Sequence, residues 1–596
     1  EFPDVFRPGK PGFDAVLGNP PWDVAKPNSQ EFFSRHDPLY RTYSKTEALR
    51  VQERLFAATP GLEEEWTRYQ GRFKAMTNWV RSGAKPFDVT LGGGKAGREL
   101  AAGWADRRAG RAHLAHPDHP FRRQGSADLN TYKLFLEAAH HLLADGGRLG
   151  FLVPSGIYTD KGSTELRRTL LERCSWEWCY GFENRAKLFP IHSSFKFVPI
   201  VVQRGGHTTA VRAAFMRHDV SEWERPDGAV VELRVEDVRR FAPATWSFLE
   251  LKSARDLELV EAIYAEHPLL GEVVERAGAQ YSAEFHMTNA ARHFTSRAKL
   301  EREGLVGPDD DLRDPRVRAR LARAGYLPLY EGKSFWQHDP YYAGRPGAES
   351  VSKAVAIATI REQLDSDAWR APRLVFRDIA SSTNQRTLIA ALMPPAVHGN
   401  KAPSLDGLGD DALPMAALFD SLLVDYVVRM KVSATLNWFY LETLPIPDAP
   451  PGGPFATRAP DLVHRLNALG ADFPEPAEDP LIDPADRLAA RLLLDALVAD
   501  LYGLHPDDFR HVAAQFPIYD KDAPEEHRYT TLAVQVYDTM SADGPEAAER
   551  RARELAAARR AAGVPFGLDE IWVPEGGWAK ANEEAREILA QAEAAA

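Results

Sequence analysis

The sequence predicts an α/β fold with a doubly wound sheet, followed by a mixed α+β region and a helical C-terminal region. Apolar runs of strand length alternate with helical periodicity between residues 13 and 203. From about residue 207 the pattern changes to helices, short strands and loops, and beyond residue 455 the clear periodicity is helical. Strands that alternate with helices form parallel sheets covered on both faces, which is the basis of the fold prediction.

The predicted sheet elements follow one another in a regular order. The first, Phe13 to Gly18, is an apolar run of strand length. After it the periodicity indicates a helix, a strand, a second helix and two closing strands, at residues 132–143, 148–153, 165–171, 176–182 and 195–203. This order is expected for the second half of a doubly wound sheet, in which ligands lie at the carboxyl ends of the strands.

The tetrad Asn19-Pro20-Pro21-Trp22 comes directly after the first strand. Its prolines lack backbone N–H groups and hold the preceding residues extended, so the corner offers carbonyl acceptors beside the Asn19 amide and the Trp22 ring. This set suits a planar ligand with an exocyclic NH₂ group, such as adenine. Two fixed acceptors would aim its delocalised nitrogen lone pair at an electrophile. The alternative is a Pro-Pro turn that ends a strand and is capped by an aromatic residue.

The tetrad and the elements after it resemble a known family. It comprises the γ-order amino-methyltransferases that transfer a methyl group from S-adenosylmethionine to adenine N6 in DNA. The resemblance implies a Rossmann-like methyltransferase sheet, S-adenosylmethionine as methyl donor and no metal. It also implies that Asn19, Pro20, Pro21 and Trp22 are catalytic, with Asn19 next to the cofactor.

The cofactor loop that the family places upstream of the tetrad is missing from the sequence. Only eighteen residues precede Asn19. Gly92 to Gly97 fits a G-x-G-x-x-G pattern, but it follows the tetrad, and such a pattern alone is weak evidence. We therefore expect a flexible loop there. The chain is interpreted as the downstream part of a longer polypeptide, whose N-terminal half would bind the cofactor.

A base must leave the duplex before it is methylated, and the extruded ring needs a second stacking surface besides Trp22. The family places an aromatic residue before the last strand, often in an aromatic-Pro pair. Phe189, which precedes Pro190, is the predicted partner. Phe195 and Phe197 are the alternatives, but they share one face of an alternating run, which also suits packing in the core.

An insertion, at about residues 27–125, separates the tetrad from its next helix. Residues 46–56 and 63–79 have helical periodicity, with aromatic residues at three- and four-residue steps. These aromatic residues predict a small core of the insertion itself, with a lid over the active site as the alternative. Basic residues that could reach phosphate, or form a solvated surface, are Arg107, Arg108, Arg111, Arg122 and Arg123.

The resemblance extends into residues 207–446, which we interpret as a target-recognition domain. Here the sequence is similar to the large type IIG-like restriction–modification and DISARM-like phage-defence methyltransferases. The matching segments are 286–289, 329–333, 377–379, 387–390, 425–426, 431–439 and 444–447. Candidates for DNA phosphates or bases are Lys333, Arg377, Arg386, Asn400, Lys431 and Asn437, although a structural bond is an alternative for each. Arg313 to Arg323 carries five arginines and predicts either a DNA-tracking helix or a solvated helical face.

The composition agrees with a multidomain globular protein. The chain has 596 residues, 44% of them hydrophobic and 27% charged, which is enough for several cores. Its two cysteines, Cys174 and Cys179, favour a reducing compartment, the bacterial cytoplasm, over a disulfide scaffold. No run of eighteen apolar residues predicts a membrane span. The net charge of −12 is compatible with DNA binding only if basic residues gather on a local face.

We expect four parts: a catalytic half at residues 1–206, the recognition domain at 207–446, a Pro/Gly linker at 447–454 and a helical domain at 455–596. Together they predict a site-specific, adenine-specific DNA methyltransferase of bacterial restriction–modification or antiviral defence, with double-stranded DNA as partner and other defence subunits as possible partners. One alternative is a non-catalytic DNA-recognition subunit. The other is methylation of RNA or of a protein, which the same tetrad permits.

Overall fold

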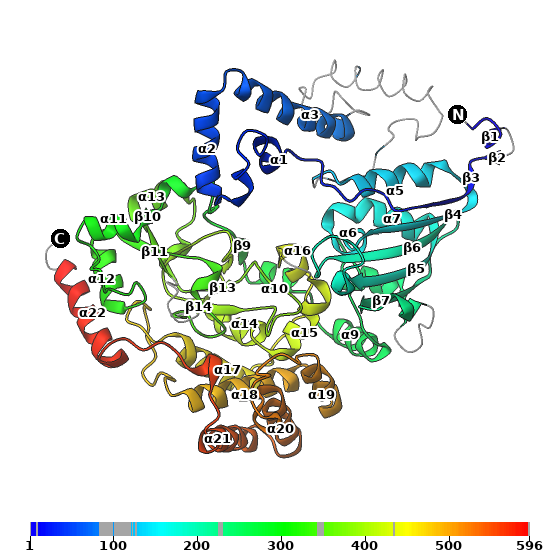
Figure 1. The fold of residues 1–596 in the computed structure, drawn as a ribbon. Helices are drawn as coiled ribbons and strands as arrows, with labels where there is room; N and C mark the ends of the chain where they lie inside the picture. The colour runs from blue at the N-terminus through cyan, green and yellow to red at the C-terminus, as the bar shows by residue number, and fades with distance from the viewer. Residues whose placement is uncertain are drawn as a thin grey trace. The chain divides into compact units, whose positions relative to one another are not determined.

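The computed structural model describes residues 2–7, 10–82, 99, 121, 123–125, 128–223, 230–342, 351–432 and 435–593. The chain separates into two compact units, Glu1–Leu257 and Glu258–Ala596 (Figure 1). Each unit has its own sheets and its own helices. Within the described ranges, no helix is both long enough and apolar enough to cross a membrane.

The first unit is built around a six-stranded sheet in the order β3-β4-β6-β5-β7-β8. The strands are β3 (Phe13–Gly18), β4 (Leu143–Pro154), β5 (Cys174–Glu183), β6 (Lys196–Arg204), β7 (Ala210–Arg217) and β8 (Val231–Arg234). β3 runs parallel to β4, and β5 runs parallel to β7, whereas β6 is antiparallel to both of its neighbours. The sheet therefore continues past residue 206, and the two units divide at Leu257, fifty-one residues beyond the boundary expected from the sequence.

The helices of this sheet follow the predicted order. α5 (Thr131–Leu142) contacts β4, and α7 (Thr164–Glu172) contacts β5. The short α6 (Gly156–Thr159) follows β4, and α8 (Val235–Phe241) follows β8. The predicted strand–helix–strand–helix–strand–strand order is confirmed, because apolar residues at helical spacing cover the sheet while β4, β5 and β6 bury most of their side chains.

The described part of the insertion contains three helices and a small aromatic core. They are α1 (Ser29–Phe33), α2 (Lys45–Ala58) and α3 (Leu62–Ser82). Phe33, Tyr40 and Trp66 are buried together, and Tyr69 packs against them. The predicted insertion core is thus confirmed, since these rings contact one another at centroid distances such as 4.9 Å for Phe33 and Trp66.

Several predictions for the insertion lie outside the described residues. These are the glycine run 92–97 and the basic residues Arg107, Arg108, Arg111 and Arg122. Arg123 is described and forms an ion pair with Glu137 (Nη1 to Oε1, 3.6 Å).

The second unit contains two four-stranded sheets, in the orders β10-β12-β11-β15 and β14-β13-β16-β9. The first comprises β10 (Thr295–Ser296), β11 (Tyr326–Tyr330), β12 (Lys353–Ala356) and β15 (Val397–His398). The second comprises β9 (Gln280–Ser282), β13 (Arg373–Phe376), β14 (Ala390–Met393) and β16 (Ser404–Asp406). Helices near these sheets are α10 (Leu270–Arg276), α11 (Arg297–Arg302), α12 (Pro315–Arg323), α13 (Ile357–Gln363), α14 (Ala412–Phe419), α15 (Leu422–Lys431) and α16 (Trp438–Leu441).

The C-terminal part of the second unit is helical, as predicted. Its helices are α17 (Pro454–Asn467), α18 (Pro484–Leu501), α19 (Pro506–Ala514), α20 (Tyr529–Asp543), α21 (Pro545–Ala561) and α22 (Gly577–Glu593). α18 is the most buried of them and contacts α17, α20 and α21. The chain is therefore an α/β protein with an α+β region and a helical C-terminal region, as the sequence predicts.

The predicted basic helix at α12 is tied into the second unit by acidic partners. Arg316 pairs with Asp314 and with Glu584 of α22. Arg318 is buried and pairs with Asp472, and Arg320 pairs with Asp310. Because these side chains are occupied by carboxylates, the interpretation as a helix that tracks DNA is not supported.

Candidate functional site

The tetrad lies where two parallel strands end. β3 ends at Gly18, which pairs with Phe151 in the parallel β4, and β4 continues to Pro154. Asn19 therefore lies at the carboxyl edge of the sheet, the edge where ligands of such sheets bind. Asn19 is exposed, Pro20 is buried and Trp22 is half-buried.

The acceptors of the tetrad differ in whether they are already used. The Thr131 hydroxyl donates to the Pro21 carbonyl (2.7 Å) and to the Asp23 carbonyl (3.0 Å), which fixes the chain after the prolines. Among the described residues, no donor bonds the Asn19 side chain or the Pro20 carbonyl. The two acceptors predicted to hold an amino group are therefore free, while the backbone beside them is fixed.

Trp22 is held in place and lies among three phenylalanines. Its indole Nε1 donates to the Leu152 carbonyl (3.2 Å). Phe195 lies parallel to the indole, with 8° between the planes and 5.9 Å between the centroids. Phe197 is also nearly parallel at 6.5 Å, but it is buried. The predicted partner Phe189 points its edge toward the indole, with 62° between the planes.

Phe195 has the geometry of a stacking partner, because it presents its face to Trp22 and remains 38% exposed. Phe189 is half-buried and packs edge-on against both Trp22 and Phe197. Of the three aromatic candidates, only Phe195 therefore combines a parallel ring with access to solvent. The structure brings Trp22 together with the chosen partner Phe189 and with both alternatives, Phe195 and Phe197.

Asn184, which the sequence analysis missed, organises the loop that carries these rings. Its buried side chain accepts from the Phe189 N–H (3.1 Å) and donates to the carbonyls of Phe189 (2.9 Å) and Ile191 (3.1 Å). Its own N–H donates to the Phe195 carbonyl (2.9 Å). One amide thus closes the loop between β5 and β6 and fixes both ends of the aromatic group. An asparagine directly after a strand is the signal that could have indicated this turn.

A second missed element is a buried polar triad on the other side of β6. Lys196, between Phe195 and Phe197, forms an ion pair with Glu250, and both side chains are buried. Tyr158 donates its hydroxyl to the same carboxylate (2.9 Å), and burial raises the pKa of Tyr158 well above its usual range. Because side chains alternate along a strand, this pair fixes which face of β6 turns toward Trp22.

In the second unit, four of the six predicted DNA contacts lie on segments that are joined by backbone contacts. Three of them follow the strands β11, β13 and β15, and Asn437 is the N-cap residue of α16. The Asp378 N–H donates to the Lys401 carbonyl (3.3 Å), and the Leu436 N–H donates to the Asp378 carbonyl (2.7 Å). A Cβ added to Gly332 would meet the Lys401 carbonyl at 2.8 Å, so these two turns are in contact. Lys333, Arg377, Asn400 and Asn437 are each within one residue of these contacts.

These four residues differ in how free their side chains are. Lys333 and Asn437 are exposed, and no side-chain bond is described for either. Asn400 uses its amide oxygen to accept from the Met287 N–H (3.1 Å). Arg377 is half-buried, donates Nε to the Phe335 carbonyl (3.1 Å) and rests over Trp336 at 4.6 Å. Burial lowers the pKa of Arg377 to about 10.

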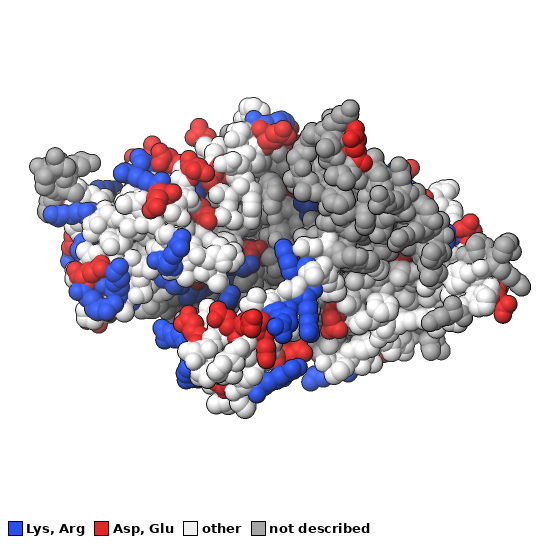
Figure 2. All heavy atoms as spheres, turned by 90° about the horizontal axis from the view of Figure 1, so that it is seen from above, with Lys and Arg blue, Asp and Glu red and all other residues white. Residues whose placement is uncertain are grey.

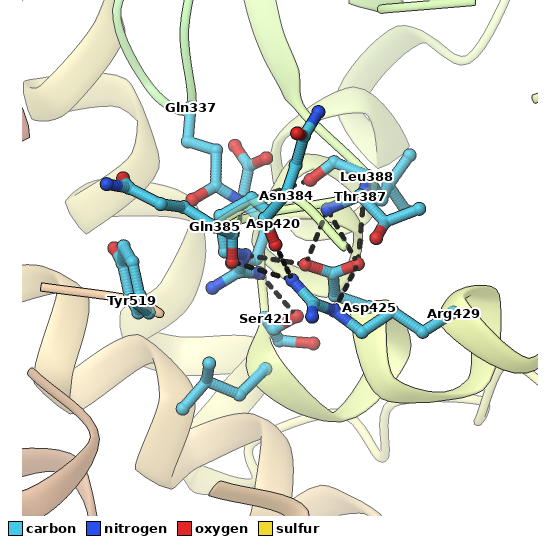
Figure 3. A network of polar contacts seen from close by, with 12 residues as sticks. Gln337, Asn384, Gln385, Thr387, Leu388, Asp420, Ser421, Asp425, Arg429 and Tyr519 are labelled. Atoms are coloured by element: carbon cyan, nitrogen blue, oxygen red, sulfur yellow. Dashed lines mark hydrogen bonds and ion pairs between the residues drawn. The ribbon is translucent and has the colours of Figure 1, made fainter. Parts of the chain in front are cut away.

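The other two predicted DNA contacts, Arg386 and Lys431, are corrected by the structure. Arg386 is fully buried and pairs with Asp425 (Nε to Oδ2, 2.8 Å). Asp425 also accepts from the Thr387 and Leu388 N–H groups, in a network that can be followed in Figure 3. The guanidinium therefore joins α15 to the segment before β14 and has no access to a surface ligand.

Lys431 is buried as well. Its ammonium group donates to the Thr443 hydroxyl (2.9 Å) and lies 5.4 Å from the Tyr264 ring centroid. Burial lowers the pKa of Lys431 to about 7. Both residues looked like surface cations in the sequence because neither Asp425 nor Thr443 could be recognised there as a partner.

The surface charge is mixed. On the face drawn in Figure 2, Lys and Arg side chains form separate groups with Asp and Glu between them. Local basic groups therefore exist despite the net charge of −12. Among the described residues, no group of three or more His, Cys, Asp or Glu is placed to hold a metal ion.

The residues present fit only part of an S-adenosylmethionine site. The Asn19 side chain and the Pro20 carbonyl match the chemistry of an acceptor for an amino group. Within the described ranges, however, no glycine loop follows a strand beside β3, and β3 has β4 as its one described neighbour.

No protein-family model matches the chain, and no curated protein matches its sequence. Among solved structures it is similar to the type IIL restriction-modification enzyme MmeI in complex with DNA, at TM-score 0.35 and 11% identity over 70% of this chain. It is also similar to the type IIG restriction endonuclease BpuSI (TM-score 0.24, 13% identity over 64% of this chain). A third is the type ISP restriction-modification enzyme LlaBIII bound to DNA, at TM-score 0.35 and 9% identity over 77% of this chain. The match spans 53%, 50% and 30% of these three proteins, respectively.

Proposed function

We propose that this chain carries the adenine-binding half of an S-adenosylmethionine-dependent, adenine-N6-specific DNA methyltransferase of bacterial restriction–modification or antiviral defence. One observation carries the proposal. Two free acceptors, the Asn19 amide and the Pro20 carbonyl, lie on a fixed backbone at the carboxyl edge of two parallel strands, beside the half-buried Trp22.

In the proposed reaction these residues bind and orient the extruded adenine. The Asn19 oxygen and the Pro20 carbonyl accept the two amino hydrogens, which turns the nitrogen lone pair toward the methyl group that the cofactor supplies. Preorganised acceptors of this kind lower the barrier because they need no reorientation during the reaction. Trp22 stacks on one face of the base, and Phe195 or Phe189 closes the other side.

Among the described residues β3 has a neighbouring strand on one side only, which supports a second part of the proposal, that a cofactor-binding partner segment completes this sheet. β3 is parallel to β4, and parallel strands are normally buried on both faces. Leu17 in β3 is nevertheless 89% exposed, and Phe135 of α5 is exposed too. A further parallel strand with its crossover helix would cover both, and it would bring a glycine loop to the edge where Asn19 lies.

The experiment compares Asn19→Ala with wild type in the full-length protein. Sequencing of plasmid DNA after expression in a methylation-deficient host identifies the modified adenines. We expect Asn19→Ala to reduce methylation about 100-fold or more, in line with the loss of one preorganised contact, while duplex binding persists. Asn78→Ala, an exposed asparagine on α3, is the matched control and should methylate normally. Retained methylation in Asn19→Ala would refute the assigned role.

The second candidate is a DNA-recognition subunit that keeps this fold without catalysis. It is favoured by one observation, the lack of a glycine cofactor loop among the described residues. Calorimetric titration with S-adenosylmethionine separates the two functions. Binding to the full-length protein supports the enzyme, whereas duplex binding without any cofactor binding supports the recognition subunit.

A further inference from the structure

An exposed isoleucine follows the end of β13 in the second unit. Ile379 is 66% exposed, although Asp378 before it and Ala380 after it are both buried. Placing such a side chain in water forgoes the favourable burial of its apolar area. An isolated exposed apolar residue is ordinary on a protein surface, so the backbone and the charges around it decide whether it has a role.

The backbone of Ile379 is fixed from both sides. The Asp378 N–H donates to the Lys401 carbonyl, and the Asp378 carbonyl accepts from the Leu436 N–H. Ile379 itself forms an antiparallel bridge with Thr435. The side chain is thus presented on a rigid base, so contact with a ligand would cost little backbone entropy.

Cationic groups flank this side chain. Lys333 is exposed on the turn that contacts the Lys401 turn, and Lys401 forms an ion pair with Asp378. Arg377, the neighbour of Asp378, is stacked on Trp336. Within the described part of the chain no carboxylate is paired with Arg377 or Lys333. The surface therefore combines a rigid apolar tip with two cations, Lys333 and Arg377, that have no carboxylate partner among the described residues.

We propose that the turn from Arg377 to Ile379 is a wedge for duplex DNA. Ile379 enters between or against base pairs, and Lys333 holds a phosphate beside it. In DNA-bending proteins, apolar side chains unstack base steps in this way. Cations beside them neutralise the phosphates of the DNA backbone. The unpaired cations beside the isoleucine favour a polyanionic ligand, and the duplex supplies both phosphates and flat apolar base faces. The inference rests on the proposed function only in taking duplex DNA as the ligand.

The test uses the full-length protein and a fluorescein-labelled mixed-sequence duplex that contains 2-aminopurine, whose fluorescence rises when it unstacks. Ile379→Ala should weaken binding about ten-fold, from the apolar area withdrawn, and should abolish the 2-aminopurine signal of the bound complex. Ile379→Leu should restore both. Val573→Ala removes another exposed apolar side chain (45% exposed) near the C-terminus and should change neither.

Lys333→Ala tests the phosphate contact separately. It should reduce the slope of log affinity against log salt by about one and leave the 2-aminopurine signal of the saturated complex unchanged. Wild-type affinity and signal in Ile379→Ala would overturn the wedge. A wild-type salt slope in Lys333→Ala would overturn the phosphate contact. Weaker association with a partner protein, with duplex binding unchanged, would identify a protein-docking surface and overturn the inference.

These results are distinguishable from those that test the proposed function. If Ile379→Ala binds and unstacks DNA like wild type while Asn19→Ala no longer methylates, the wedge is refuted and the methyltransferase function is supported. If DNA binding and unstacking depend on Ile379 but the protein binds no S-adenosylmethionine, the wedge is supported and the recognition subunit is favoured over the enzyme.

Discussion

The indole of Trp22 and the ring of Phe195 lie parallel, with 8° between their planes and 5.9 Å between their centroids. A base stacked between two rings needs about 7 Å between them, twice the contact distance of about 3.5 Å. The two rings therefore fill part of the space that an extruded adenine would need. Trp22 is held by its bond to the Leu152 carbonyl, so Phe195 is the ring expected to move when a base enters.

The first prediction compares Phe195→Ala with Phe189→Ala. Stacking on an aromatic side chain contributes about 1–3 kcal/mol per base. Because Phe195 presents its face to Trp22 and Phe189 its edge, Phe195→Ala should weaken binding of the extruded base by about that amount, and Phe189→Ala by clearly less. The measurement is the fluorescence of 2-aminopurine placed in the duplex instead of the adenine that sequencing identifies as modified. Equal losses in both variants, or a larger loss in Phe189→Ala, would return the stacking role to Phe189.

The second prediction concerns the buried pair Lys196–Glu250. Lys196→Met leaves the Glu250 carboxylate buried with the Tyr158 hydroxyl as its remaining donor, which should cost about 3–5 kcal/mol of unfolding free energy. Lys196→Met combined with Glu250→Gln removes the uncompensated charge and should recover much of that loss. Calorimetric unfolding of the single and double variants gives the coupling energy. A double variant that loses the sum of both single effects would show that the pair does not act as a unit.

The sequence predicts the part of the site that is local in the chain. β3 and the tetrad are adjacent in sequence, and the periodicity of α5, β4 and α7 places them in order, so the acceptors and Trp22 could be found. The Lys196–Glu250 pair could not, because its two members lie fifty-four residues apart in the sequence. Arg386 failed as a DNA contact for the same reason, since its partner Asp425 belongs to a different element. Asn184 bonds residues only five and seven positions away, so its turn had a local signal in the asparagine that directly follows a strand.

The third prediction tests Asn184 as the organiser of the aromatic loop. Asn184→Ala leaves the Phe189 N–H and the carbonyls of Phe189 and Ile191 without this amide, which should cost about 1–3 kcal/mol. Hydrogen exchange should speed up between residues 185 and 195 and remain unchanged in β4. Asn437→Ala is the control, because that asparagine is exposed and makes no side-chain cap bond. Unchanged exchange in the loop would remove Asn184 from this role.

The fourth prediction is a pH dependence of stability from Lys431. Burial lowers the pKa of Lys431 to about 7 in the folded chain, whereas an unfolded lysine titrates near about 10.4. Between these values the unfolded state binds the proton and the folded state does not, so unfolding takes up a proton. The free energy of unfolding should therefore rise with pH from about 7 to about 10, by up to about 1.4 kcal/mol per pH unit. Below about pH 7 Lys431 is protonated in both states, and the folded chain is destabilised by the full cost of burying the charge.

Lys431→Met isolates this contribution, because the Thr443 hydroxyl keeps its own bond to the Tyr440 carbonyl (3.0 Å) and loses only the ammonium donor. We expect Lys431→Met to be more stable than wild type at neutral pH. The difference in melting temperature should shrink toward about pH 10, because the unfolded lysine then also loses its proton and keeping Lys431 neutral in the folded chain costs less. Lys333→Met removes an exposed lysine and should leave the pH profile of wild type unchanged. Melting curves of Lys431→Met and wild type that shift in parallel with pH would mean that Lys431 keeps its proton in the folded chain throughout this range.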